Sequence, residues 1–237
     1  MQELTVRLEM VFEQVKKARK DAVSGRVIDV GSDHGYLAVR CLEEDLAESA
    51  VCTEIHKGPA QRSQDALVEA GFGDSSEVYI TDGLKGVPLM AGDTVVIAGM
   101  GGLNIVDIIT RALKDNGYHV FENVTFVLQP QKSNDIVRKY LSKAGFVFVD
   151  EDVCYDRDIF YNCMRVVFKG ISTTITDEEA CYGPVLLKKN ISGDKAVAEY
   201  FDHLNEVFEI RQRSNPTVKS GFRRKEEKCR SMTLNII

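Results

Sequence analysis

The sequence predicts an α/β protein whose sheet is mostly parallel and ends in an antiparallel hairpin, followed by a small helical domain. Two observations predict the sheet. Short β-branched runs alternate with amphipathic helical patterns over residues 26–144, as in βαβ units joined by right-handed crossovers. The alternation then stops at two strand-like runs, Phe146–Val153 and Ile159–Phe168, which are separated only by a short turn. That spacing is typical of an antiparallel hairpin at one end of a parallel sheet.

The first βα unit follows an amphipathic helix expected over residues 3–18, where apolar residues recur at helical spacing. In Arg26–Tyr36 (RVIDVGSDHGY) an apolar strand runs directly into a glycine turn, and a helical pattern begins at Tyr36. Gly31 and Gly35 bracket the turn, where the missing side chain lets a ligand approach the backbone. The N–H groups at the start of the next helix are free to bind that ligand.

The remaining units are read from the same alternation and from turn residues. Pro59 suits the first turn of a helix that runs to about Gly71, and Gly145 ends the last helix of the series. The four further strands are expected at Ala50–Glu54, Glu77–Thr81, Thr94–Ala98 and Asn123–Leu128, and the later helices at Leu103–Asn116 and Ser133–Ala144.

The C-terminal part is expected to be helical. A polar segment, Gly170–Asp177, marks a boundary, and helical patterns over Asp177–Asn190 and Lys195–Ile210 predict a helical hairpin. Beyond Arg211 the chain becomes basic, which favours either contact with phosphates or a solvated run of charge. We therefore expect a Rossmann-like domain over residues 1–170 and a helical, coiled-coil-like domain with a basic tail over residues 171–237.

Composition limits the functional class. The 237 residues carry a formal net charge of −6, which argues against wholesale coating of nucleic acid. No apolar run approaches the roughly 20 residues of a membrane span, and the N-terminus lacks the layout of a secretory signal. The six cysteines and four histidines show no metal-binding spacing. We expect a cytoplasmic protein without a metal, either a monomer or a weak dimer.

Polar and glycine residues stand at the end of every predicted parallel strand. They are Gly31-Ser32-Asp33-His34, Glu54, Asp82-Gly83, Gly99-Met100-Gly101-Gly102 and Gln129-Pro130. Ligands of open α/β sheets bind at the carboxyl ends of strands. The sequence therefore predicts a binding site along this edge.

Individual residues suggest what the site holds. Glu54 follows the glycine turn by about 20 residues, where an acid binds the two hydroxyls of a ribose; its alternative is a helix cap. Asp82 could accept from the exocyclic amine of an adenine beside Gly83, although an Asp-Gly pair also forms simple turns. Asp33 and His34 face the mouth of the site, with His34 equally suited to a structural role.

The spacing of the glycine turn argues against a nicotinamide cofactor. The turn reads G-x-x-x-G and not G-x-G-x-x-G. A terminal antiparallel hairpin is found in Rossmann-like sheets of methyltransferases and is absent from nicotinamide domains. By this fold-level analogy we expect a sheet of the methyltransferase type.

Seven short motifs together resemble the bacterial TrmK family of tRNA (adenine-N1)-methyltransferases, which act at position 22 of tRNA. They are Arg7-Leu8, DVGSDHGYL (Asp29–Leu37), EIHKGP (Glu54–Pro59), TDGL (Thr81–Leu84), IAGMGG (Ile97–Gly102), LQP (Leu128–Pro130) and YGPVLL (Tyr182–Leu187). The resemblance implies S-adenosylmethionine (SAM) as cofactor, tRNA as partner and a C-terminal helical domain that helps to hold the tRNA. It implies a cofactor pocket, with the target base beside it, formed by Gly31, Asp33, His34, Glu54, Asp82, Gly83, Gly99 and Met100, and it brings Arg7 to the same site.

We therefore expect methyl transfer from SAM to N1 of an adenine in tRNA. The attacking nitrogen carries a lone pair, so alignment and charge stabilisation matter more than a strong base. Asp33 is the first candidate for steadying the target ring, and Arg7 for lining the site. The alternatives are a nicotinamide-linked oxidoreductase, a methyltransferase acting on another RNA or a small molecule, and a non-catalytic module that binds SAM or RNA.

Overall fold

The chain folds around one seven-stranded sheet with the strand order β3-β2-β1-β4-β5-β7-β6. This computed structural model describes residues 3–20 and 25–214. The strands are β1 Arg26–Val30, β2 Ser49–Glu54, β3 Ser76–Ile80, β4 Thr94–Met100, β5 Thr125–Pro130, β6 Phe146–Asp156 and β7 Ile159–Phe168. Strands β1 to β5 pair in parallel, and β7 runs antiparallel to both β5 and β6. The predicted mostly parallel sheet with a terminal antiparallel hairpin is confirmed.

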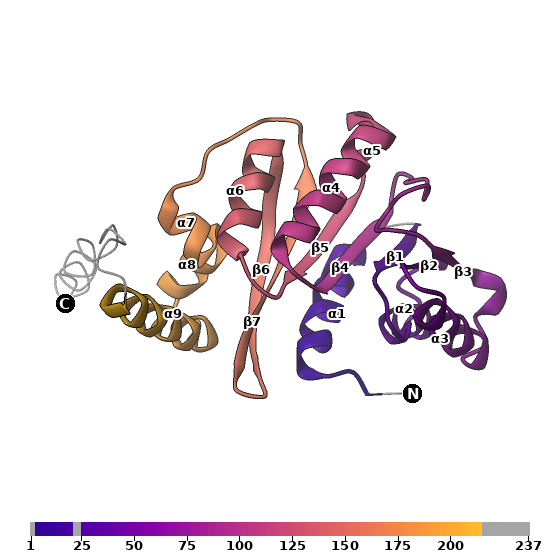
Figure 1. Cartoon of the computed structure of the whole chain (residues 1–237), viewed down its shortest axis with the longest axis horizontal. Coiled ribbons are helices and arrows are strands. Elements are labelled where there is room, and N and C mark those ends of the chain that lie inside the picture. Colours follow the sequence, from indigo (N-terminus) through magenta and orange to yellow (C-terminus); the bar gives the residue numbers. More distant parts are fainter. Residues whose placement is uncertain (1–2, 21–24, 215–237) are drawn as a thin grey trace.

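Helices cover both faces of the sheet (Figure 1). They are α1 Val6–Arg19, α2 Tyr36–Glu43, α3 Lys57–Glu69, α4 Gly102–Asn116, α5 Tyr118–Phe121 and α6 Asn134–Ala144, with a 3-10 turn, η1, at Gly73–Ser75. Apolar residues of α4, α5 and α6 form the larger core with one face, and those of α1, α2 and α3 bury the other. A parallel strand buried on both faces needs an almost continuous apolar run, which β4 and β5 have.

The β6–β7 hairpin extends past the carboxyl edge of the parallel strands. Its pairing with β5 runs only as far as Leu128 with Met164, so the start of β7 lies beyond that edge. The turn is tight because Arg157 and Asp158 both take positive φ values, of 49° and 63°, the geometry of a two-residue hairpin turn. The tip therefore lies on the side of the sheet where the polar strand ends gather.

The C-terminal helices are α7 Asp177–Tyr182, α8 Pro184–Ile191 and α9 Lys195–Ser214. The prediction of one helix over Asp177–Asn190 is wrong, because Gly183 breaks it with φ 102°. Only glycine fits there: a Cβ would lie 2.6 Å from the Glu151 carboxylate. Pro184 then opens α8 at a position that favours proline.

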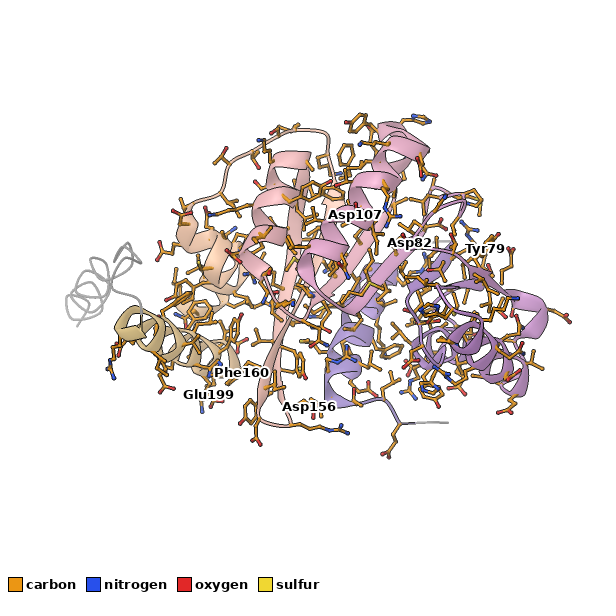
Figure 2. All side chains as sticks on the ribbon, viewed as in Figure 1. Tyr79, Asp82, Asp107, Asp156, Phe160 and Glu199 are labelled. Carbon is orange, nitrogen blue, oxygen red and sulfur yellow. The ribbon has the colours of Figure 1, made fainter. Side chains whose placement is uncertain are left out.

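Helix α9 packs on the hairpin through aromatic rings. Phe160 of β7 lies 5.8 Å from Tyr200 and 5.1 Å from His203, measured between ring centroids. Figure 2 shows Phe160 next to α9, the helix that carries the labelled Glu199. The division into domains 1–170 and 171–237 stays a prediction. The predicted basic tail, from residue 215 onwards, lies outside the described residues.

Candidate functional site

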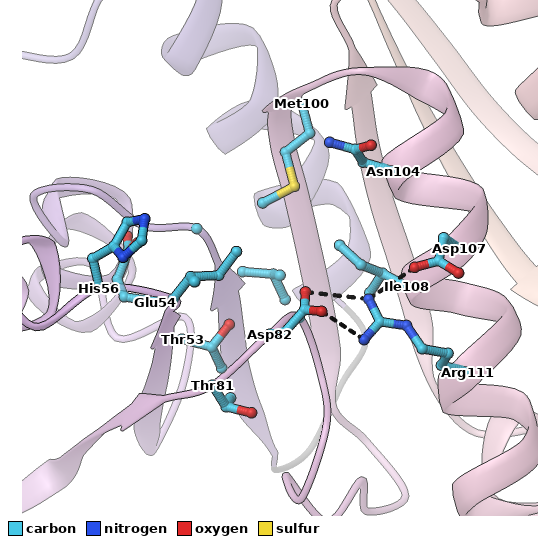
Figure 3. Close-up of a pocket in the computed structure, with 14 residues that line it drawn as sticks. Thr53, Glu54, His56, Thr81, Asp82, Met100, Asn104, Asp107, Ile108 and Arg111 are labelled. Carbon is cyan, nitrogen blue, oxygen red and sulfur yellow. Dashed lines mark hydrogen bonds and ion pairs between the residues drawn. The ribbon is translucent and has the colours of Figure 1, made fainter.

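A cavity of about 360 Å³ opens at the carboxyl ends of β1 to β4, against α4. Of the predicted cofactor residues, the cavity is lined by Gly31, Glu54, Asp82, Gly83 and Met100 (Figure 3). These residues come from four different strand ends. The parallel pairing of β1 with β2 and β4, and of β2 with β3, brings these ends to one edge. The site therefore lies where an open α/β sheet is expected to bind its ligand.

Gly31 forms the floor of the cavity at the end of β1. Its N–H donates to the carbonyl of Thr53 at 2.8 Å, which continues the pairing with β2 into the turn. Its φ is +71°, and a Cβ at this position would collide with the methyl group of Met100. Glycine thus permits both the left-handed turn and the close approach of Met100 across the cavity.

Glu54 ends β2 and holds the glycine turn. Its Oε1 accepts from the N–H of Asp33 and, at 3.4 Å, from the hydroxyl of Ser32. These bonds tie the turn after β1 to the end of the neighbouring strand. The second carboxylate oxygen has no protein donor among the described residues, so it is available to a ligand.

Asp82 belongs to a small network of ion pairs with two residues of α4. Arg111 donates to its two carboxylate oxygens at 2.8 and 3.2 Å and also pairs with Asp107 at 2.9 Å (Figure 3). Hydrogen bonding from Arg111 lowers the pKa of Asp82, so this carboxylate is ionised near neutral pH. Sequence analysis missed Arg111 and Asp107. Their i, i+4 spacing on the helix that follows β4 was the available signal.

Asp33 and His34 lie beside the cavity, and their side chains are not among its lining residues. The Asp33 carboxylate, which is 67% exposed, pairs with Arg62 of α3 at 2.7 Å. The His34 ring stacks on Tyr36 at 5.1 Å and lines a second hollow between α2 and α3. The backbone N–H of Asp33 donates to Glu54, which lines the cavity. The roles of the Asp33 and His34 side chains stay predictions.

Arg7 and Gly99 lie together at the other end of the site. The guanidinium Nη1 of Arg7 is 3.3 Å from the position that a Cβ on Gly99 would occupy. Gly99 directly precedes Met100, which lines the cavity. The structure therefore brings Arg7 from α1 to the end of β4, beside the cavity and outside its lining.

Two findings bear on other kinds of site. Among the described residues, no group of three or more His, Cys, Asp or Glu side chains is arranged to hold a metal ion. Within residues 3–20 and 25–214, no helix is both long and apolar enough to cross a bilayer.

Comparison with known proteins identifies the family. Residues 27–227 match the family model of TrmK, tRNA (adenine(22)-N(1))-methyltransferase. The tRNA (adenine(22)-N(1))-methyltransferase of Bacillus subtilis is 27% identical over 238 residues, covering 94% of this chain and 92% of the relative.

Solved structures agree with this match. Streptococcus pneumoniae Sp1610 in complex with S-adenosyl-L-methionine superposes with a TM-score of 0.74 at 26% identity, covering 88% of this chain and 91% of that one. A protein of the NADB-Rossmann superfamily from Streptococcus agalactiae gives a TM-score of 0.74 at 28% identity, covering 92% and 90%. The strand-end motifs, the cavity they line and the family match over most of the chain agree, and the chain belongs to the TrmK family of tRNA (adenine(22)-N(1))-methyltransferases.

Proposed function

We propose that the cavity at the carboxyl ends of β1 to β4 is the SAM site and that the target adenine enters beside it, over the Gly99–Gly102 segment. A member of the TrmK family is a SAM-dependent enzyme that methylates N1 of an adenine in tRNA. The observation that carries the placement is the convergence of Glu54, Asp82 and two strand-end glycines on one cavity. We also propose that the protein works in the cytoplasm.

The residues of the cavity fit this cofactor in size and charge. About 360 Å³ lies within the usual range for cofactor sites. Glu54, Asp82 and Asp107 outnumber the single arginine of the lining, Arg111, so the cavity favours a ligand with net positive charge. SAM is such a ligand, because it carries a sulfonium and an ammonium against one carboxylate.

Each residue has a proposed task. Glu54 binds the ribose hydroxyls through its free oxygen, and Asp82, fixed in orientation by Arg111, accepts from the adenine amine of the cofactor. Gly31 and Gly83 let the flat parts of the cofactor lie against the backbone. Met100, the residue of the Gly99–Gly102 segment that lines the cavity, offers an apolar surface to the target base. His34 remains a proposed neighbour of the cofactor at the turn.

Bound SAM supplies a methyl group on positively charged sulfur. The N1 lone pair of adenine needs no deprotonation, so this chain needs no strong general base. Its residues have to align the base and tolerate a ring that becomes positively charged. Asp33 is the proposed carboxylate for steadying that ring, which would require it to leave Arg62 when tRNA binds.

Glu54→Gln is expected to weaken SAM binding by about tenfold to a hundredfold, the value of one charge-assisted hydrogen bond. The amide oxygen can still accept from Asp33, so the glycine turn should persist while the charged partner of the ribose is lost. Isothermal titration calorimetry measures the dissociation constant. Glu122→Gln, an exposed change next to α5, is the matched control. Equal affinity in Glu54→Gln and wild type would refute the ribose role.

The reaction is tested by incubating the full chain with methyl-labelled SAM and unmodified tRNA. We expect 1-methyladenosine on mass analysis of the nucleosides. A different methylated nucleoside would show another substrate for the same fold. Binding of SAM and tRNA without any methylation would favour the non-catalytic module.

A further inference from the structure

Gln129, at the end of β5, joins three segments at the edge of the cavity. It is fully buried. Its Oε1 accepts from Nη1 of Arg7 at 2.8 Å and from the N–H of Gly99 at 3.1 Å, while its Nε2 donates to the carbonyl of Pro130 at 3.1 Å. A buried amide with all these bonds made has one orientation. Gln129 therefore fixes the guanidinium of Arg7 against the end of β4.

Arg7 is a cation without a carboxylate partner. Its guanidinium carbon lies 5.8 Å from the centre of the Tyr161 ring on β7, and none of the ion pairs found among the described residues includes Arg7. Arg26, Arg111 and Arg138, in contrast, each pair with an aspartate or glutamate. A neutral amide and an aromatic face hold Arg7 in position and leave its positive charge uncompensated.

Lys132 places a second such cation at the other end of the Gly99–Gly102 segment. Its carbonyl accepts from the N–H of Gly102 at 3.1 Å, and its Cε lies 3.6 Å from the position of a Cβ on Gly101. The side chain is exposed, and the ion pairs of the described residues do not include it. A Cβ on Gly102 would lie 2.6 Å from the Lys132 carbonyl, so glycine permits this contact.

Two cations without carboxylate partners, beside the proposed entry of the target base, are free to bind an anion. The methylated adenine is itself positively charged, so a cation against the ring would oppose the reaction. Phosphates of the tRNA backbone are the anions that accompany the base to this edge, and arginine and lysine are their usual partners.

We infer that Arg7 and Lys132 form a phosphate clamp for the tRNA backbone on either side of the target adenosine, with Gln129 as the residue that positions Arg7. This inference rests on the proposed placement of the adenine at the Gly99–Gly102 segment. The sequence led us to expect Arg7 at the catalytic site. In the inferred clamp, Arg7 contacts the phosphate backbone of the tRNA and not the target base.

The salt dependence of tRNA affinity tests the clamp. Each phosphate contact contributes about 0.7 to 0.9 to the slope of log Kobs against log salt. Arg7→Ala and Lys132→Ala are each expected to reduce the slope by about that amount. SAM affinity, measured by calorimetry, should change less than twofold, because neither side chain lines the cavity.

Lys143→Ala is the matched control. Lys143 is exposed in the last turn of α6, the helix that starts just after Lys132, and lies about 15 Å further along its axis. This variant removes the same charge from the far end of the helix, and its slope should equal that of wild type.

Gln129→Leu tests the positioning role, since it keeps the volume and loses the acceptor. The salt slope of Gln129→Leu should be reduced by as much as that of Arg7→Ala. The double variant Arg7→Ala/Gln129→Leu should show no further reduction, because both changes remove the same phosphate contact. Slopes equal to wild type in Arg7→Ala and Lys132→Ala, with 1-methyladenosine still formed by wild type, would overturn the clamp alone. Absence of 1-methyladenosine with wild type would overturn the proposed function.

Discussion

Glu151→Gln is expected to lower the free energy of unfolding by about 3–5 kcal/mol, the usual cost of removing one partner from a buried ion pair. Glu151 of β6 and Arg138 of α6 form such a pair at 2.8 Å, and both side chains are fully buried. The glutamine keeps the shape and leaves the arginine charge without its counter-charge. Urea denaturation of the full chain measures the change.

The cost should be large because the pair holds the C-terminal helices on the sheet. Arg138 donates to the carbonyls of Ala180 and Cys181 in α7 and to the side chain of Asn162 in β7. The other oxygen of Glu151 accepts from the N–H of Val185 at 2.9 Å, at the start of α8. Loss of the carboxylate therefore weakens the cap of α8 as well as the pair.

Lys139→Gln is the control, since Lys139 follows Arg138 in sequence and pairs with Asp177 at 2.6 Å on the surface. A surface pair is worth only about 0–1 kcal/mol. The double variant Arg138→Met/Glu151→Leu should recover only part of the lost stability. Two apolar side chains leave no buried charge, but the carbonyls of Ala180 and Cys181 lose their donor. A loss below about 1 kcal/mol in Glu151→Gln would contradict this account.

The fold could be predicted because each parallel strand is apolar and ends in turn formers. The helix break at Gly183 could not be predicted. It depends on the close approach of Glu151 from β6, which is 32 residues away in the sequence. Helix propensity and periodicity are local signals, whereas this contact is tertiary.

The candidate site shows the same limit. Glu54 and Asp82 were predictable because a parallel sheet places successive strand ends on one edge. The arginines that pair with the acids of the site were not predictable. Arg62 draws the Asp33 carboxylate towards α3, and Arg111 holds Asp82 from α4. Long arginine side chains reach across helices that pack on the sheet, and sequence spacing does not show which acid they meet.

Asp29→Asn is expected to change the free energy of unfolding of the ligand-free protein in a pH-dependent way. The variant should gain about 4 kcal/mol on wild type between pH 4 and pH 7. Asp29 is 5% exposed in β1, paired in register with Cys52 and Val96. Burial, with a smaller contribution from the charge of Glu54, raises its pKa from 3.8 to about 7. In the sequence, Asp29 is the acid within the RVIDV run of β1.

The direction of this pH dependence follows from whether the folded or the unfolded chain binds the proton of Asp29. Between pH 4 and 7 the folded chain keeps Asp29 protonated and the unfolded chain does not, so the stability of wild type falls as the pH rises through this range. Above pH 7 both states are ionised, and the folded state carries the full cost of a buried carboxylate. The asparagine is neutral at every pH and escapes this loss.

Urea denaturation from pH 4 to pH 8, without SAM, measures the difference between the variant and wild type. That difference should grow over this range and level off above pH 7. Asp115→Asn, an exposed change in α4, controls for the loss of one carboxylate. A difference that stays constant with pH would show that Asp29 has the same pKa in the folded and unfolded chains. In that case the buried acid would not be what weakens the fold at neutral pH, and its place beneath the glycine turn would cost the protein nothing.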